Sequence, residues 1–188
     1  MINKIISQAI FKHRDVLKLI DEELIKSSYE LMKYALKNGS TIFWCGNGGS
    51  ASQANHLSAE LVGGMYQKKI KPFKSICLNV DTSFITAWSN DNSFDNIFLR
   101  QIESLGKAGD ILIGLSTSGN SPNIIKAAEF AQSNGLQVIS LTGNDGGILN
   151  KFSDININIP TSSTQRIQEM HILIGHILCD LVEKNCRK

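Results

Sequence analysis

His56 and Glu60 are four residues apart, and this pair is well placed in the sequence to move a proton or to bind a metal ion. In a helix, residues at this spacing lie on one face, with their Cβ atoms about 5–6 Å apart. An imidazole and a carboxylate at that distance can share a divalent cation or work as general acid and base. Both uses stay open at this point, beside the simpler one of a surface ion pair.

A glycine-rich segment, residues 46–51 (GNGGSA), comes shortly before this pair. It formally matches the dinucleotide-binding pattern G-x-G-x-x-A, which also requires an acidic residue about twenty positions later. The nearest candidate, Asp81, stands 33 positions beyond Gly48 (81 − 48). We therefore interpret the segment as a close approach of the backbone to a small polar or anionic ligand, with Asn47 and Ser50 as hydrogen-bond donors.

Residues 116–122 (STSGNSP) form a second polar segment, rich in hydroxyl groups. Ser121 suits a helix N-cap and Pro122 suits the first helical position, so a helix is predicted to begin here. The free backbone amides of that helix, the positive end of its dipole and the hydroxyl groups together favour a phosphate ligand. Because the segment has no Lys or Arg, a phosphate monoester is favoured over a polyphosphate with metal.

The C-terminal stretch, residues 166–185, predicts a helix that carries further candidate side chains. Gln168 and His176 differ by eight residues, about 12 Å along a helix axis. Both could serve one metal ion only if their side chains converge or if another subunit intervenes. We interpret His171 as a structural or interface residue, and we expect His13 to be exposed or interfacial.

Alternating strands and helices must position these residues. Strands are predicted from apolar runs at 41–45, 75–79, 110–115, 137–141 and 155–159, and helices at 50–63, 94–105, 122–134 and 166–185. The apolar runs are continuous, so the sheet is expected to be parallel, doubly wound and buried on both faces. Ligands bind such a sheet outside the carboxyl ends of its strands, so Asn90 and Asp91 are expected to face the same pocket.

The first 38 residues have a helical apolar period and are predicted to form two helices that end near Gly39. The helices predicted later in the chain already cover the sheet, so we expect these two N-terminal helices to pack against another subunit. The whole chain, 1–188, is predicted to be a single domain, with residues 39–188 as its α/β core.

Composition and charge argue against several classes of function. The net charge of +2 is too balanced to predict nucleic-acid binding, and we interpret the densest basic run (Lys68, Lys69, Lys71 and Lys74) as solvated surface. The sequence has no apolar run long enough to cross a membrane and no segment typical of a signal peptide. Its four cysteines lack metal-site or disulfide-framework spacing, so a cytoplasmic location is expected.

The sequence resembles the sugar isomerase (SIS) family over essentially its whole length, on motifs in this order: GNGGSA, HLSAE, SND, STSGNSPN, LTG and RIQEMH. The likeness is to members that convert sedoheptulose 7-phosphate into D-glycero-D-manno-heptose 7-phosphate, the first step toward nucleotide-activated heptoses for surface polysaccharide. It implies a flavodoxin-like, five-stranded parallel sheet with two N-terminal helices. It also implies a homotetramer with active sites at subunit interfaces, and one zinc ion per subunit.

The resemblance implies roles for individual residues as well. Substrate contacts are expected at Asn47, Gly48, Gly49, Glu60, Asn90, Asp91 and Gln168, and phosphate contacts at Ser116, Thr117, Ser118 and Ser121. Zinc ligands are implied at His56, Glu60, Gln168 and His176, with Glu60 and His176 as the catalytic acid/base pair. One departure is Gln165, where some members have Asp immediately before RIQE.

The expected reaction is an aldose–ketose isomerisation through an enediol, with the order of proton transfers between Glu60 and His176 left open. Three alternatives remain. The first is a non-catalytic SIS protein that binds a sugar phosphate or a replication initiator, and retention of Glu60 and His176 argues against it. The second is an oxidoreductase that binds a dinucleotide, and the third is an isomerase of another sugar phosphate.

Overall fold

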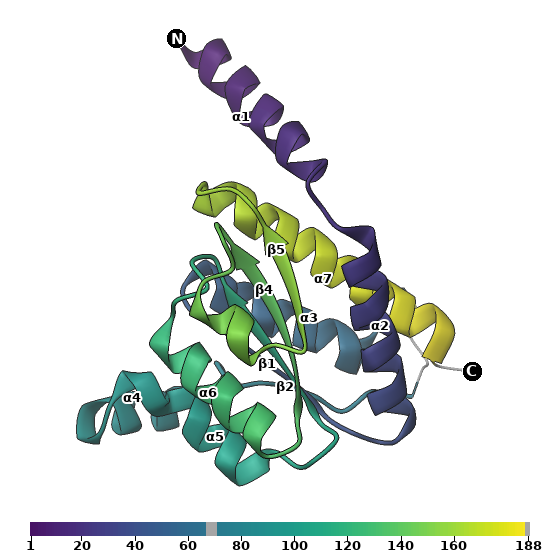
Figure 1. Ribbon diagram of the computed structural model, residues 1–188, viewed down its shortest axis with the longest axis vertical. Helices are drawn as coiled ribbons and strands as arrows, with labels where there is room; N and C mark the ends of the chain where they lie inside the picture. Colours follow the sequence, from purple (N-terminus) through teal and green to yellow (C-terminus); the bar gives the residue numbers. More distant parts are fainter. Residues whose placement is uncertain (67–70, 187–188) are drawn as a thin grey trace.

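The computed structural model describes residues 1–66 and 71–186 and forms a parallel sheet between layers of helices (Figure 1). The strands are β1 (Ile42–Gly46), β2 (Ser75–Cys77), β3 (Ile111–Ser116), β4 (Gln137–Gly143) and β5 (Ile155–Ile159). The α-helices are α1 (Ile2–Leu17), α2 (Glu22–Lys37), α3 (Gly49–Gly63), α4 (Thr82–Asp91), α5 (Ile97–Leu105), α6 (Pro122–Ser133) and α7 (Thr164–Cys186). Two short 3-10 helices, η1 (Phe94–Asn96) and η2 (Ile148–Phe152), complete the described elements.

The sheet has the strand order β2-β1-β3-β4-β5, and every pair is parallel. This is the flavodoxin-like order, so the predicted doubly wound sheet is confirmed. Strands β1 and β3 are neighbours, with Gly46 paired to Leu115 at their carboxyl ends. The order of the strands reverses at this pair, and the glycine-rich and serine-rich segments therefore leave the sheet side by side.

Each face of the sheet is covered by its own helices. The side chains of β1 show the division, because Ile42 and Trp44 pack with α2, α3 and α7, whereas Phe43 and Cys45 pack with α5 and α6. Every residue of β1 and β3 is buried, as the continuous apolar runs predicted. Burial raises the pKa of the Cys45 thiol, which behaves as a small apolar side chain.

Helix α4 was not predicted from the sequence. The Asp81 carboxylate caps it by accepting a hydrogen bond from the Phe84 amide at 2.9 Å. Asp81 is thus a helix cap in this fold, and not the ribose ligand of a dinucleotide site. The helix is only ten residues long and has no fully buried residue, so it carries little of the apolar period that reveals a longer helix.

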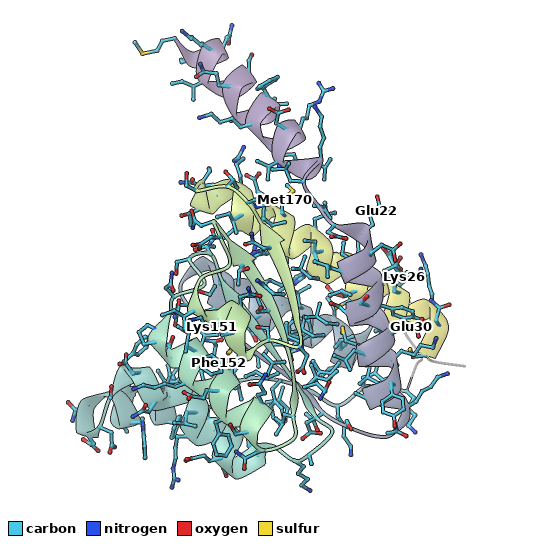
Figure 2. All side chains as sticks on the ribbon, viewed as in Figure 1. Glu22, Lys26, Glu30, Lys151, Phe152 and Met170 are labelled. Carbon is cyan, nitrogen blue, oxygen red and sulfur yellow. The ribbon has the colours of Figure 1, made fainter. Side chains whose placement is uncertain are left out.

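Helix α2 is amphipathic and belongs to the core. Its buried face includes Tyr29 and Met32, and Figure 2 shows the charged side chains of its outer face, namely Glu22, Lys26 and Glu30. Asn38 caps its C-terminus, and Gly39 follows with φ +76°, a left-handed conformation that glycine adopts without strain. The predicted helix stop at Gly39 is therefore confirmed.

Helix α1 projects away from the rest of the chain (Figure 1). Two polar contacts tie it to the start of α7: Arg166 Nη1 donates to the Ala9 carbonyl at 2.6 Å, and His13 Nδ1 lies 2.6 Å from Glu169 Oε2. The His13 side chain is therefore partly exposed and joins α1 to α7, whereas the sequence predicted an exposed or interfacial residue. The apolar side chains of α1 remain largely uncovered in a single chain, with exposed fractions of 74% at Ile2 and 65% at Phe11.

Two further expectations concern the surface. Among the described residues, no helix has both the length and the apolar character needed to span a membrane. In the basic run, Lys68 and Lys69 lie outside the described residues, whereas Lys71 and Lys74 are exposed. Lys74 Nζ donates to the Gly39 carbonyl at 2.9 Å.

Helices α3 and α7 approach closely at Gly175, where any larger residue would overlap the buried side chain of Leu57. One turn earlier on α7, the buried His171 donates from Nε2 to the Thr142 carbonyl of β4 at 3.0 Å. Burial lowers the pKa of His171 to about 4, so this imidazole is neutral near pH 7. The structural role expected for His171 is thus confirmed, and together the two contacts hold α7 against both α3 and the sheet.

We predict that Gly175→Ala lowers the free energy of unfolding by about 1–3 kcal/mol, because the added methyl group overpacks the contact with Leu57. Denaturant titration at a fixed protein concentration measures this loss. Leu57→Ala in the same chain removes the overlap, so the double variant should lose less than the sum of the two single variants. Additive losses, or a fully stable Gly175→Ala variant, would contradict the prediction.

Candidate active site

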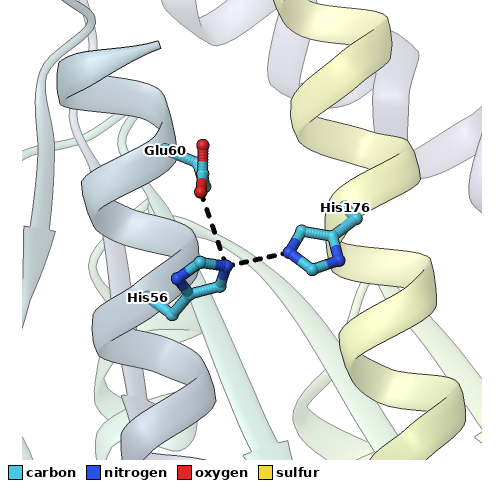
Figure 3. A group of neighbouring side chains, drawn as sticks. All are labelled: His56, Glu60 and His176. Carbon is cyan, nitrogen blue, oxygen red and sulfur yellow. Dashed lines mark hydrogen bonds and ion pairs between the residues drawn. The ribbon is translucent and has the colours of Figure 1, made fainter. Parts of the chain in front are cut away.

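Three side chains from α3 and α7 meet at one point (Figure 3). His56 Nε2 lies 2.9 Å from His176 Nε2 and 3.4 Å from Glu60 Oε1, and the ligand atoms of the three residues are all within 4.8 Å of one another. The His56 side chain is 48% exposed and that of Glu60 is 22% exposed, so the cluster opens to solvent in a single chain. The structure therefore confirms that His56 and Glu60 share a face, and it adds His176.

The geometry of this cluster suits a divalent metal ion. Two imidazole nitrogens that face each other can share one proton at most, whereas a cation uses both lone pairs. Zinc with Zn–N bonds of about 2.0–2.1 Å in a tetrahedral site would hold its nitrogen ligands about 3.3 Å apart, close to the observed separation. Two nitrogens and a carboxylate also leave a fourth position for another ligand, as catalytic zinc sites do.

The glycine-rich segment joins β1 to α3 and begins the helix that carries His56 and Glu60. Gly48 has φ +56°, a conformation that a glycine tolerates, and Gly49 is the first residue of α3. The Asn47 side chain exchanges two hydrogen bonds with Asn123, and Ser50 is buried. Both side chains that we expected to donate to a ligand are therefore directed into the protein, and the exposed part of the segment is its glycine backbone.

Gln168 lies against this same segment. Its amide nitrogen would be only 2.7 Å from a Cβ atom at Gly49, so the Gln168 side chain in this position lies directly against the glycine. Gln53 of α3 donates from Nε2 to the Gln168 carbonyl at 2.7 Å and so ties the two helices together at this level. Gly49 precedes His56 by seven residues, about 10 Å along α3. The structure thus brings Gln168 to the glycine-rich segment, whereas His176 meets His56 two turns further along.

The serine-rich segment joins β3 to α6 as predicted, with Ser121 at the N-cap and Pro122 as the first helical residue. The Ser121 hydroxyl is 2.9 Å from the Ser116 hydroxyl, and this bond replaces a side-chain cap to the helix amides. The Ser118 hydroxyl accepts a hydrogen bond from the Asn120 amide at 3.1 Å. Hydroxyl groups of the serine-rich segment thus gather at the positive end of α6, where an anion is stabilised.

The segment from the end of β4 to the start of η2 packs against the serine-rich segment and hydrogen-bonds to it. The Leu149 amide donates to the Gly119 carbonyl at 2.9 Å, and the Ile148 amide donates to Asn120 Oδ1 at 3.0 Å. The backbones of Gly119 and Gly147 are so close that a Cβ atom on either would overlap the other segment. The serine-rich segment therefore has its own anchors, independent of α3.

Asn90 and Asp91 lie on neither of these two segments but at the exposed C-terminal end of α4. There Asn90 Nδ2 donates to Asp91 Oδ1 at 2.8 Å. Figure 1 shows α4 beside α5, on the far side of the sheet from α2 and α7. Gln165 is exposed in the first turn of α7.

Two asparagines near the loops were missed by sequence reasoning. Asn79 follows β2 and pairs with the backbone of Gly46, through Oδ1 to the amide at 3.2 Å and Nδ2 to the carbonyl at 2.8 Å. Asn123 stands in the first turn of α6 and pairs with Asn47 at 2.9 Å in both directions. Asn79 was predicted as the last residue of a strand, and Asn123 follows a helix-starting proline; these positions were the available signals, but they do not reveal a partner.

Comparison with known proteins assigns the family. Residues 4–143 match the family described as "SIS domain". A phosphoheptose isomerase of Helicobacter pylori (strain P12) is 45% identical over 188 residues, which cover 98% of this chain and 97% of the relative. One of Helicobacter hepaticus is 49% identical over 162 residues, 86% of this chain and 82% of the relative.

A solved structure gives the same answer. The phosphoheptose isomerase GmhA from Neisseria gonorrhoeae superposes with a TM-score of 0.91 at 37% identity, over 98% of this chain and 100% of that one. Sequence similarity and fold therefore agree along nearly the whole length. The chain belongs to the SIS domain family and, within it, to the phosphoheptose isomerases.

Proposed function

We propose that this chain catalyses the reversible isomerisation of sedoheptulose 7-phosphate to D-glycero-D-manno-heptose 7-phosphate, the step that leads toward heptoses of surface polysaccharide. The observation that carries the proposal is the cluster in which His176 of α7 meets His56 and Glu60, which lie on the helix that follows the glycine-rich segment. An acid/base cluster on α3 and α7, together with a phosphate-sized group of hydroxyls and amides at the carboxyl edge of the sheet, fits a sugar phosphate with a reactive carbonyl.

The phosphate is assigned to Ser116, Thr117, Ser118 and Ser121. These residues offer hydroxyl groups and the free amides of α6, and the site contains no competing carboxylate of its own segment. The sugar hydroxyls are assigned to the exposed backbone of Gly48 and Gly49 and to Gln168, which lies against Gly49. The Asn47 side chain is paired with Asn123 and is given no direct contact with the sugar. Asn90 and Asp91 stay candidates for the sugar chain, and their exposure on α4 suits a contact completed by another subunit.

The isomerisation moves one proton between neighbouring carbons. A base takes the proton from carbon 1 of the ketose, the C–H electrons form the carbon 1–carbon 2 double bond, and the carbonyl oxygen gains a proton to give a cis-enediol. The oxygen on carbon 1 then loses its proton as carbon 2 gains one, which leaves the aldose. Glu60 and His176 are the proposed pair, since they come from two helices and can lie on different sides of the carbon chain.

His56, Glu60 and His176 would hold one zinc ion per subunit. Gln168 lies against Gly49 in its own chain, so it would join them as a further ligand only from another subunit. A zinc ion there would polarise the carbonyl and stabilise the charge that develops on its oxygen. Glu60 has two carboxylate oxygens, of which one faces His56 and the other points away from the ring (Figure 3). One carboxylate can therefore contact a cation and still present an oxygen to the substrate.

We further propose that the working enzyme is a cytoplasmic homotetramer with active sites at subunit interfaces. The exposed apolar face of α1 and an apolar groove of about 730 Å³ between α2 and α7 support this, because soluble chains rarely leave such surfaces uncovered. The openness of the His56 cluster supports it too. The cysteine spacing is the support for a reducing compartment.

The proposal predicts that purified protein converts sedoheptulose 7-phosphate, followed by NMR, and that Glu60→Gln lowers kcat by at least about a hundredfold. His176→Gln should have a similar effect, because either loss removes one of the two proton carriers. Glu103→Gln, an exposed carboxylate paired with Arg100, is the matched control and should keep full activity. Binding of the sugar phosphate without any conversion by the unmodified protein would instead favour the non-catalytic SIS class.

Metal removal gives a second test. Treatment with a chelator should abolish conversion, and added zinc should restore it. His56→Ala should bind less zinc than the unmodified protein by elemental analysis, whereas His13→Ala, which changes a histidine outside the cluster, should bind the normal amount. Full activity of a protein shown to be free of metal would refute the zinc assignment.

A third test concerns assembly. Ile10→Asp introduces a charge on the exposed apolar face of α1 and should shift the mass measured by light scattering from four chains to fewer, with loss of activity. Lys12→Asp, on a different face of the same helix, is the matched control and should leave the tetramer intact. A single-chain mass for the unmodified protein would contradict the proposed interface.

A further inference from the structure

Asn47 and Asn123 form a closed amide pair between the two loops of the site. Asn47 Nδ2 donates to Asn123 Oδ1, and Asn123 Nδ2 donates to Asn47 Oδ1, each at 2.9 Å. The two residues are 76 positions apart in the chain, and Asn123 is only 1% exposed. Each side chain thus satisfies one donor and one acceptor of the other, in a place where an unpaired amide would be costly.

The pair lies just beyond the end of the sheet. The last register contact between β1 and β3 joins Gly46 to Leu115, and after it the chains separate into the two loops. Asn47 belongs to the segment that starts α3, the helix of His56 and Glu60, whereas Asn123 belongs to the first turn of α6. The amide pair therefore links the start of the catalytic helix to the start of the phosphate-binding helix.

Each loop is also held on its outer side, by different contacts. Asn79 pairs with the backbone of Gly46 on one side, and the Leu149 amide with the Gly119 carbonyl on the other. The Ser116–Ser121 hydroxyl contact lies within the serine-rich segment itself. Loss of the amide pair would leave these anchors in place, so each loop would keep its shape while the distance between them became free to change.

We propose that Asn123 is a positioning residue, which acts through Asn47 to hold the catalytic helix at a set distance from the bound phosphate. This rests on the proposed function, because that function places phosphate on the serine-rich segment. A neutral amide suits the task better than an ion pair, since it adds no charge beside a phosphate and is directional at both ends. An aspartate at this position would place a negative charge near the anion.

The test compares Asn123→Leu, Asn47→Leu and the double variant. Leucine has the same number of side-chain heavy atoms and the same branching as asparagine, and it removes both hydrogen bonds. We expect kcat for sedoheptulose 7-phosphate to fall about tenfold or more in Asn123→Leu, because a small misplacement of reacting groups is costly. The dissociation constant of inorganic phosphate, measured by calorimetry, should stay within about twofold, since the serine-rich segment keeps its own anchors.

The double variant reports whether Asn123 acts through Asn47. If it does, the double variant should be no slower than the slower single variant. Asn134→Leu is the matched control, because Asn134 caps the C-terminus of the same helix α6 and its side chain donates to the Phe130 carbonyl one turn earlier. It should keep normal kcat and phosphate affinity.

The alternative outcomes are distinct. Weakened phosphate binding in Asn123→Leu would overturn the proposal and make Asn123 part of the phosphate site. If the fold-losses in kcat of the two single variants multiply in the double variant, Asn47 and Asn123 act independently, which would also overturn it. Unchanged kcat would show that the pair is not needed for positioning. If Asn123→Leu does not fold, Asn47→Leu breaks the same pair from its partly exposed side and decides the question. Absence of turnover in the unmodified protein would refute the proposed function instead.

Discussion

The close packing of α3 against α7 is the contact on which the whole site depends. His56 and His176 are 120 residues apart in the chain, and their nitrogens come within 2.9 Å only because the helices carrying them touch. Gly175 makes this approach possible, because a Cβ atom there would overlap the buried Leu57 side chain. A side chain at Gly175 would separate the helices at a point where the chemistry requires them close together.

The polar part of the site is held by neutral groups. Side-chain amides of Asn79, Asn123 and Gln168 contact the glycine-rich segment from three different elements, and hydroxyl groups and helix amides form the phosphate-sized site. Such hydrogen bonds are directional and leave the local charge unchanged. They can therefore define the shape of a binding site for an anionic substrate without competing with it electrostatically.

Two parts of the single chain are exposed to solvent, the His56 cluster and the apolar face of helix α1. The first is partly exposed to solvent, and the second carries apolar side chains that its own chain does not cover. Arg166 and Glu169 connect these two features, because they bind α1 to helix α7, which also carries Gln168 and His176. Another subunit that packs on α1 would therefore also contact the chain next to α7, the helix that carries His176.

The sequence by itself determined the parallel sheet, its flanking helices and the shared face of His56 and Glu60, because apolar periodicity and i, i+4 spacing are local properties. It also located the helix start at Ser121 and Pro122. It missed the short helix α4 and the partners of Asn79 and Asn123, which no period reveals. The resemblance implied a shared metal site for His56 and His176, but only the tertiary structure brought their ring nitrogens together and paired Asn47 inward with Asn123. Those contacts depend on how α3, α6 and α7 pack, and packing is decided by residues distant in the sequence.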